Sequence, residues 1–287
     1  MSRLPLLAGV AAGLFLCGTA QALSIYIPPL PERVANARAI IVGTVTAIEK
    51  EPVIAPAGPK SEQKIRFQVA VVKVDENLLG AKGLTDLRVG FVPPPAPAPV
   101  GGNNGLPEIP YVGPPELKVG MTALFVLAAH PGETFYTARG VRDVLVKAGD
   151  AKEFTVELKQ ARHLASLLAD PRAGLTAKDA NARFLTGGML ICRYRNFGVR
   201  GGEAPPKTVP IDAEENKLIL AALRGADWAA QRPDNFTPEH VFLRLPLTAK
   251  EGWTRPRDYK QIPAAARAWL EKHKDTYRIE KLAEQQP

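Results

Sequence analysis

The chain has 287 residues, of which 46% are hydrophobic and 23% charged, and its formal net charge is +8. This composition is typical of a globular protein and excludes a mainly disordered chain, and the length is enough for two domains of roughly 100–150 residues each. The basic residues alternate with Asp and Glu and form no Lys/Arg block. The charge therefore argues against nucleic acid as a partner and supports at most a mild attraction to anionic surfaces.

Residues 1–22 have the features of a secretory signal peptide. Arg3 gives a positive start, an apolar run follows, and Ala20-Gln21-Ala22 places small residues where signal peptidase reads them. The apolar run is too short to predict a membrane span. We expect secretion or export to the periplasm, with cleavage near Ala22. A lipid anchor at Cys17 is disfavoured, because Leu16 occupies a position that a lipobox gives to a small residue.

The first half of the remaining chain reads as a series of short strands after one short helix at Pro31 to Arg38. Alternating or β-rich runs predict strands at residues 39–48, 64–74, 86–92, 121–128, 135–138 and 144–146. Gly43 in the first of these predicts a bulge or a sharp bend. Residues 51–63 are expected to be a loop and residues 77–83 a turn.

Residues 93–115 form a long segment that is dense in Pro, Gly and Asn and has no apolar period. Proline-rich segments bind aromatic grooves at a low entropic cost, so a partner could recognise this loop. The alternative is a plain spacer between two strands. The candidate binding residues in or beside the loop are Phe91, Pro95, Ile109, Tyr111 and Val112. In an alternating antiparallel sheet, this loop and the loop at residues 49–63 are expected at the same end.

From residue 149 onward the apolar period becomes helical. Helices are expected around residues 156–168, 177–194, 213–224, 238–245 and 262–274. Asp212 and Thr237 have the side chains and the positions of N-caps. The Gly187-Gly188 pair predicts close helix packing or a break.

The sequence predicts no catalytic, cofactor or metal site. The four histidines stand singly, and no HExxH, G-x-S-x-G or P-loop pattern occurs. His130 precedes Pro131-Gly132 and is expected to mark a hairpin turn. Cys192, the cysteine that remains after cleavage, has apolar neighbours, which predict a buried and unreactive thiol.

Three segments, "ARAIIVGTVTAI", "QVAVVKVDENLLG" and "LKVGMTALFVL", carry a family resemblance over about residues 30–147. Their strand-and-turn pattern resembles the OB-type barrel of the TIMP/netrin-like secreted modules. The resemblance implies a fold and an extracytoplasmic setting, and no activity. TIMP-like inhibitors chelate the zinc of a protease with an N-terminal cysteine. The expected mature start here is Leu23, so that mechanism is not carried over.

We therefore expect an α+β protein, with a small OB-like antiparallel β-barrel at residues 30–148 followed by a mostly helical region at residues 149–282. The expected role is that of an exported, non-catalytic binding module of the cell envelope or extracellular space. Its expected partner is a protein or an envelope component. The chain itself is expected to have no stable membrane span after cleavage and no cofactor. The alternatives are a secreted hydrolase with an unrecognised site between barrel and helices, or a loop-based inhibitor of a secreted hydrolase.

Overall fold

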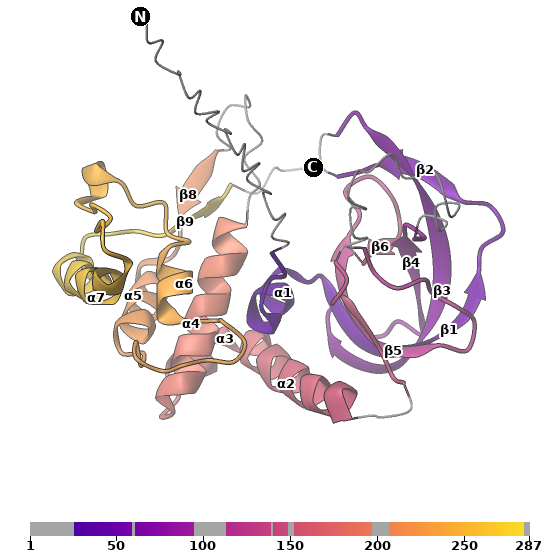
Figure 1. Ribbon diagram of the computed structural model, residues 1–287, viewed down its shortest axis with the longest axis horizontal. Coiled ribbons are helices and arrows are strands. Elements are labelled where there is room, and N and C mark those ends of the chain that lie inside the picture. The colour runs from indigo at the N-terminus through magenta and orange to yellow at the C-terminus, as the bar shows by residue number, and fades with distance from the viewer. Residues whose placement is uncertain are drawn as a thin grey trace, which may run out of the picture.

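The protein consists of a curved sheet and a group of helices, which a computed structural model describes over residues 26–58, 61–94, 113–138, 140–148, 152–196 and 207–283. Figure 1 shows the sheet on one side, the later helices on the other, and α1 (Leu30–Asn36) and α2 (Lys152–Ala169) between them. The expected α+β class is confirmed. The proposed signal peptide at residues 1–22 lies outside the described residues.

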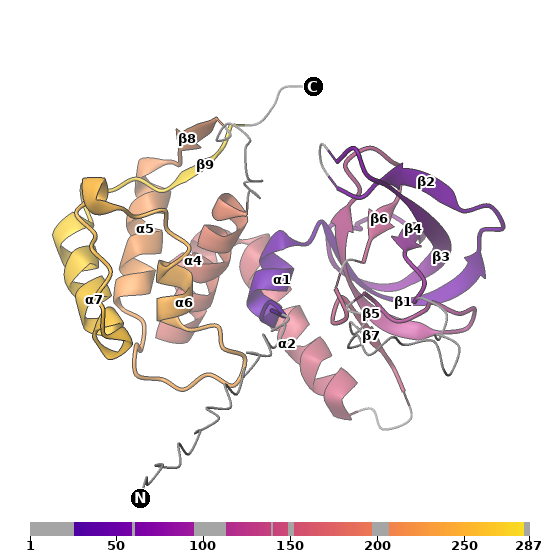
Figure 2. The same ribbon diagram turned by 45° about the horizontal axis from the view of Figure 1, so that its top comes forward.

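The sheet closes on itself in a ring. Its strands follow the order β1-β3-β4-β6-β5-β7, and β1 also pairs with β5, which closes the ring and leaves β7 attached to β5 (Figure 2). Their bounds are β1 Ala39–Ile48, β2 Val53–Pro56, β3 Lys64–Leu79, β4 Asp86–Phe91, β5 Thr122–Ala129, β6 Tyr136–Thr137 and β7 Val144–Val146. The expectation of a wholly antiparallel sheet is wrong at one pairing, because β4 and β6 run parallel. The turn between β5 and β6 reverses the chain and gives β6 the direction of β4.

β3 is the longest strand and extends beyond its expected end. It runs to Leu79 because Asn77 and Leu79 still pair with the first residues of β1, where a turn was expected. The register between β1 and β3 shifts at Val42/Gly43, so the bulge predicted at Gly43 is confirmed. A Cβ atom on Gly43 would lie 2.6 Å from Cγ1 of Val72, so the bulge brings the two strands too close for a side chain.

β2 lies inside the segment that was expected to be a loop, and that expectation is wrong for residues 53–56. The strand pairs antiparallel with β3, from Val53 opposite Phe67 to Pro56 opposite Lys64. β2 pairs with β3 alone, and a proline at the end of an edge strand breaks no ladder hydrogen bond. Short edge strands carry a weak local pattern, which explains why this one was missed.

The helices form the second half of the core, around α4. Besides α1 and α2 they are α3 Pro171–Leu175, α4 Ala180–Arg195, α5 Ala213–Arg224, α6 Pro238–Phe242 and α7 Ile262–His273, with 3-10 turns at Ala249–Glu251 and Tyr259–Gln261. The caps at Asp212 and Thr237 are confirmed, since each side chain accepts a hydrogen bond from a backbone N–H of its own first turn. The Gly187-Gly188 pair does not break α4. A Cβ on Gly188 would lie 2.8 Å from the Phe236 ring, so the glycines allow close packing.

The short helix α1 belongs structurally to the helical core although it precedes the strands. Leu30, Val34 and Ala35 are buried in one hydrophobic cluster with residues of α2, α4 and α5. A second cluster fills the ring of strands. An unexpected pair of short strands, β8 (Thr208–Pro210) and β9 (Glu280–Leu282), closes the helical region at its far end. Within the described ranges, no helix is both long enough and apolar enough to cross a membrane.

Candidate functional site

A cleft lies between the helices and the sheet. It has a volume of about 370 Å³. Its walls come from the segment before α1, from α1 itself, from β5 and from the turn at residues 140–143, with Asn196 at the end of α4. Val126 and Ala128 alternate with Leu127 along β5, and Val126 packs in the helical cluster while Leu127 packs inside the ring. The face of β5 that carries Val126 and Ala128 is therefore the face toward the helices and the cleft. Ligand sites are commonly found at such junctions between two packed regions.

The polar groups of the cleft are not all satisfied. Arg33 has a side chain that is only 9% exposed, and its Nη2 donates to Oε1 of Glu157 at 2.7 Å. Its Nη1 donates to the carbonyl oxygen of Arg142. The Nε of Arg33 and the Oδ1 of Asn36 are buried without a hydrogen-bond partner. Buried polar atoms without partners cost free energy and are uncommon in folded proteins, so two of them at one cavity mark it as a functional candidate.

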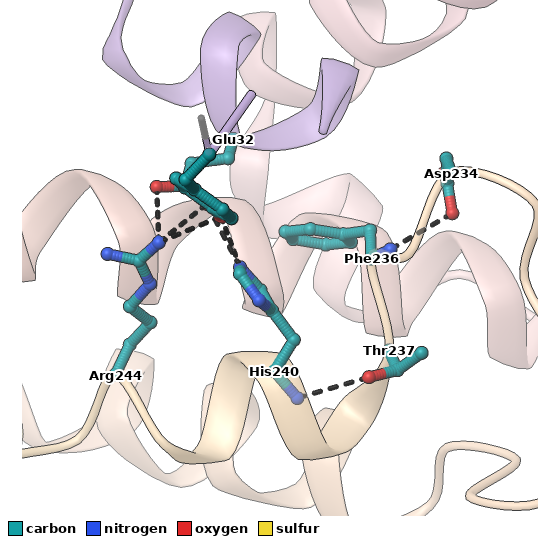
Figure 3. Close-up of polar contacts among 7 residues, drawn as sticks. Glu32, Asp234, Phe236, Thr237, His240 and Arg244 are labelled. Carbon is teal, nitrogen blue, oxygen red and sulfur yellow. Dashed lines mark hydrogen bonds and ion pairs between the residues drawn. The ribbon is translucent and has the colours of Figure 1, made fainter. Parts of the chain in front are cut away.

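Beside the cleft, the carboxylate of Glu32 is the centre of a polar cluster that joins α1 to α6 (Figure 3). Its Oε2 accepts a hydrogen bond from the Tyr26 hydroxyl at 2.9 Å and lies 2.9 Å from Nε2 of His240. Its Oε1 accepts from Nη2 of Arg244 at 2.7 Å. The Thr237 cap positions His240, because its Oγ1 accepts a hydrogen bond from the His240 backbone N–H at 3.1 Å. Tyr26 belongs to both features, since it also lines the cleft.

The electrostatics of this cluster keep Glu32 ionised. Burial raises the pKa of its carboxyl group, but the hydrogen bonds from His240 and Tyr26 and the charge of Arg244 outweigh burial and hold the pKa below its usual value. Burial, followed by the hydrogen bond to Glu32 and the charge of Glu32, raises the pKa of Tyr26 to about 12. At neutral pH the Glu32 carboxylate is therefore ionised and accepts hydrogen bonds from the neutral Tyr26 hydroxyl and the cationic Arg244.

The cluster is better suited to fixing α1 than to nucleophilic catalysis. The nearby thiol of Cys192 is buried, and burial, followed by the charge of Glu32, raises its pKa to about 12. A thiol with that pKa is protonated at neutral pH and is a poor nucleophile. The expectation of a buried, unreactive thiol is thus supported by its surroundings. Across the described residues, no three His, Cys, Asp or Glu side chains gather as a metal site requires.

Of the sequence-based binding residues, the structure describes Phe91 alone. Phe91 is fully buried in the core of the ring and does not line the cleft, so its ring is not an exposed contact for a partner. The residues Pro95, Ile109, Tyr111 and Val112 lie outside the described residues, and their role stays a prediction. β1 and β4 both run antiparallel to β3, so Ile48 and Phe91 end at the same side of the sheet, as expected for the starts of the two loops.

His130 stands in the turn after β5, as predicted, and it has a further role. The backbone N–H of Gly132 donates to its Nδ1 at 3.1 Å, so the ring proton is on Nε2, which lies 3.0 Å from the carbonyl oxygen of Pro56. The ring also packs 5.4 Å from the Phe67 ring and 4.8 Å from the Phe135 ring, measured between centroids. His130 thus fastens the end of β2 to the turn between β5 and β6.

Comparison with known proteins finds no family model and no curated protein that matches this chain. The cleft is therefore interpreted from its own geometry. Sequence reasoning missed it because its polar residues carry no motif: Arg33 and Asn36 are single residues on a short helix. The one local signal is the apolar segment Tyr26-Ile27-Pro28, which precedes the helix and has no strand or helix pattern of its own.

Proposed function

We propose that this chain is an exported, non-catalytic binding module that holds its ligand in the cleft between the sheet and the helices. The observation that carries the proposal is the pair of buried, unpartnered polar atoms at the cleft, Arg33 Nε and Asn36 Oδ1. A ligand in the cleft would supply the missing hydrogen bonds once the two buried side chains turn toward it, and would so remove their desolvation cost. Enclosure by two regions of the protein would give it a large contact area for its size.

The fold and the setting form part of the same proposal. We propose that the ring of strands is an OB-like barrel related to the TIMP/netrin-like modules, because β1 is bulged at Gly43 and pairs with both β3 and β5. We also propose that residues 1–22 direct the chain to the periplasm or the exterior. In this reading, the loop residues Pro95, Ile109, Tyr111 and Val112 form an additional contact for a larger partner.

Affinity capture from the native envelope tests the proposal, with the chain from Leu23 onward as bait. A cleft-filling variant, Ala128→Phe, places a ring on the face of β5 that lines the cleft. Its matched control, Ala47→Phe, puts the same ring at an exposed position on β1. We expect Ala47→Phe to hold the component that the unmodified chain holds, and Ala128→Phe to lose it.

A third bait separates the cleft from the loop. In it, residues 93–115 are replaced by a short Gly-Ser turn. If this form alone loses the component, the binding site is on the loop and the cleft proposal is wrong. If all forms hold the component equally, neither feature binds it. Each bait is first checked for an unchanged far-UV spectrum and melting temperature.

A further inference from the structure

The segment Tyr26-Ile27-Pro28, which we call the strap, forms one wall of the cleft. Tyr26 is 56% exposed and Ile27 is 47% exposed. No residue of the strap packs in a hydrophobic cluster, whereas Leu30 at the start of α1 is buried in the helical one. Within the described ranges, no backbone group of the strap makes a hydrogen bond. A segment with so few contacts separates from the protein at a lower free-energy cost than the core does.

The prolines make the strap stiff. Pro28 and Pro29 each fix their own φ, and each restricts the residue before it to an extended conformation. Pro29 is buried and extended, with φ −60° and ψ 154°, and its carbonyl oxygen accepts a hydrogen bond from the backbone N–H of Arg33 at 3.0 Å. The strap is therefore a short extended rod whose fixed end is Pro29, and it moves as one piece.

The side chain of Tyr26 fastens the other end of the strap. Its hydroxyl donates to Oε2 of Glu32 at 2.9 Å, accepts from Nη2 of Arg244 at 3.1 Å and lies 3.5 Å from Nε2 of His240. Its ring stacks on the His240 ring at 6.3 Å between centroids, and the guanidinium carbon of Arg244 lies 5.9 Å from the ring centroid. Among the described residues, these are the hydrogen bonds and ring contacts that hold the strap.

The cluster that receives Tyr26 does not depend on it. Oε1 of Glu32 accepts from Arg244 at 2.7 Å, and its Oε2 lies 2.9 Å from Nε2 of His240. If Tyr26 leaves, the carboxylate keeps both of these partners. Water then replaces the lost hydroxyl, because Tyr26 and Arg244 both contact solvent. A hydrogen bond that water can replace contributes little net stability, so the Tyr26 contact is a reversible one.

We propose that the strap is the gate of the cleft: the Tyr26 side chain holds it closed against Glu32 and Arg244, and it swings about Pro29 to admit a ligand. This inference rests on the proposed function, and it specifies how the ligand enters. The wall formed by β5 stays in place, because β5 pairs with β1 on one edge and with β6 and β7 on the other. The opening of such a segment limits the rate at which a ligand enters and leaves.

Thiol labelling inside the cleft tests the inference in the full chain. Val126→Cys places a thiol in the lining, at a position that is 4% exposed. Cys17→Ser is added, so Cys192, which is 3% exposed in the helical cluster, is the one native thiol left. Iodoacetamide is the probe, and mass spectrometry of the digested protein measures the rate at each thiol. We expect the thiol at position 126 to react faster than Cys192, because the strap opens more often than the core.

A variant of Tyr26 assigns this opening to the strap. Tyr26→Phe keeps the ring and removes the hydroxyl, so we expect labelling at position 126 to become about five- to tenfold faster and labelling of Cys192 to stay unchanged. Tyr259→Phe is the matched control. Tyr259 is 66% exposed and its hydroxyl also hydrogen-bonds to a carboxyl group, that of Glu239, but it does not line the cleft. This control should leave both rates unchanged.

Three results overturn the inference. Tyr26→Phe leaves labelling at position 126 unchanged, or it speeds Cys192 by the same factor, which means that the whole helical core opens. The third is faster labelling in Glu153→Gln and not in Tyr26→Phe. Glu153 pairs with Arg142, so this result makes the turn at residues 140–143 the moving wall.

The labelling needs no ligand, so it separates the gate from the proposed function. If Tyr26→Phe has no effect on labelling while capture from the envelope still depends on Ala128, the gate is wrong and the proposed function stands. If Tyr26→Phe speeds labelling while capture is independent of the cleft, the motion of the strap is confirmed and the proposed function fails.

Discussion

Arg244 donates from a single nitrogen, Nη2, to both carboxylate oxygens of Glu32, at 2.7 and 2.9 Å. The two residues are 212 positions apart in the sequence, and they connect α1 to the segment that follows α6. Glu32 has a side chain that is 8% exposed, whereas the side chain of Arg244 is 38% exposed. The pair therefore joins a buried anion to a cation that still contacts solvent.

Removing the cation of this pair should destabilise the protein. In Arg244→Met, Glu32 stays buried and loses a charged donor, and we expect the free energy of unfolding to fall by about 1–3 kcal/mol, a range reduced for the exposure of Arg244. Arg224→Met is the matched control, because Arg224 is also 38% exposed but pairs with Glu271, which is 58% exposed. Chemical denaturation should show little change for this control. Equal losses of unfolding free energy in the two variants would mean that the burial of Glu32 does not strengthen its ion pair with Arg244.

The depressed pKa of Glu32 predicts a defined pH dependence. Its contribution to stability is fully present above the unfolded value, 4.5, and is lost as the pH falls through the lower folded-state pKa. At neutral pH, Glu32→Gln should be less stable than the unmodified chain, because Arg244 and His240 lose the carboxylate. The difference should narrow as the pH falls below about 4.5. Denaturation curves at pH 7, 5 and 3.5 measure it, and a difference that stays constant to pH 3.5 contradicts the prediction.

Gly80 and Gly83 have the same left-handed backbone conformation but different surroundings, so substituting each by alanine separates the cost of backbone strain from the cost of steric crowding. Gly80 and Gly83 have φ values of +74° and +80°. A Cβ on Gly80 would lie 1.9 Å from the carbonyl oxygen of Arg38, whereas nothing lies within 4 Å of a Cβ on Gly83. Gly83→Ala should therefore cost roughly 1–2 kcal/mol for the left-handed conformation alone. Gly80→Ala should cost at least about 2 kcal/mol more. Equal costs by thermal denaturation would mean that the turn relaxes away from Arg38.

His130 should stabilise β2 in particular. His130→Ala removes the donor to the carbonyl of Pro56 and leaves a gap beside Phe67 and Phe135, so we expect a loss of about 2–3 kcal/mol. Hydrogen exchange at Ala55 and Ala57 should become faster than in the unmodified chain. His163→Ala, at an exposed position on α2, should change stability by less than about 0.5 kcal/mol. Unchanged exchange at β2 would show that its pairing with β3 suffices.

The thiol of Cys192 should be inert in the folded protein. Its pKa of about 12 and its burial leave almost no accessible thiolate at pH 8. A disulfide reagent such as DTNB should react at the rate of global unfolding, and Arg244→Met should speed that reaction. Rapid reaction of the folded, unmodified chain would contradict the burial of this side chain.

The elements that could be predicted are those with local signals. Asp212 and Thr237 cap helices through their own first turns, and the alternation from Lys64 to Val74 identifies most of β3. Gly43 indicates a bulge because glycine inside a strand often marks one. Each of these signals is contained within a few consecutive residues. The strand β2 and the pair β8–β9 have no such signal. Each forms because another segment of the chain provides the backbone groups that it hydrogen-bonds with.

The candidate site could not be predicted for a related reason. Glu32 looks like any acidic residue in a first helical turn, and its burial depends on residues near α6 that pack against it. Its partners His240 and Arg244 lie 208 and 212 residues further along the chain. Phe91, a candidate contact beside the expected loop, is buried in the ring instead, because it ends β4 on the same face as Leu87 and Val89. Spatial convergence of single residues leaves no pattern in one sequence.

The packing of α1 has a consequence for the order in which the chain can fold. Glu32 of α1 is synthesised 208 and 212 residues before His240 and Arg244, the residues that hold its carboxylate. Contacts between distant segments tend to form late in folding, because the entropy cost of closing a long loop comes before the contacts stabilise the chain. A nascent or truncated chain that lacks residue 244 can form the ring of strands while α1 remains weakly held. The wall of the cleft that carries Arg33 and Asn36 is thus held firmly only when His240 and Arg244 are available to fold against α1.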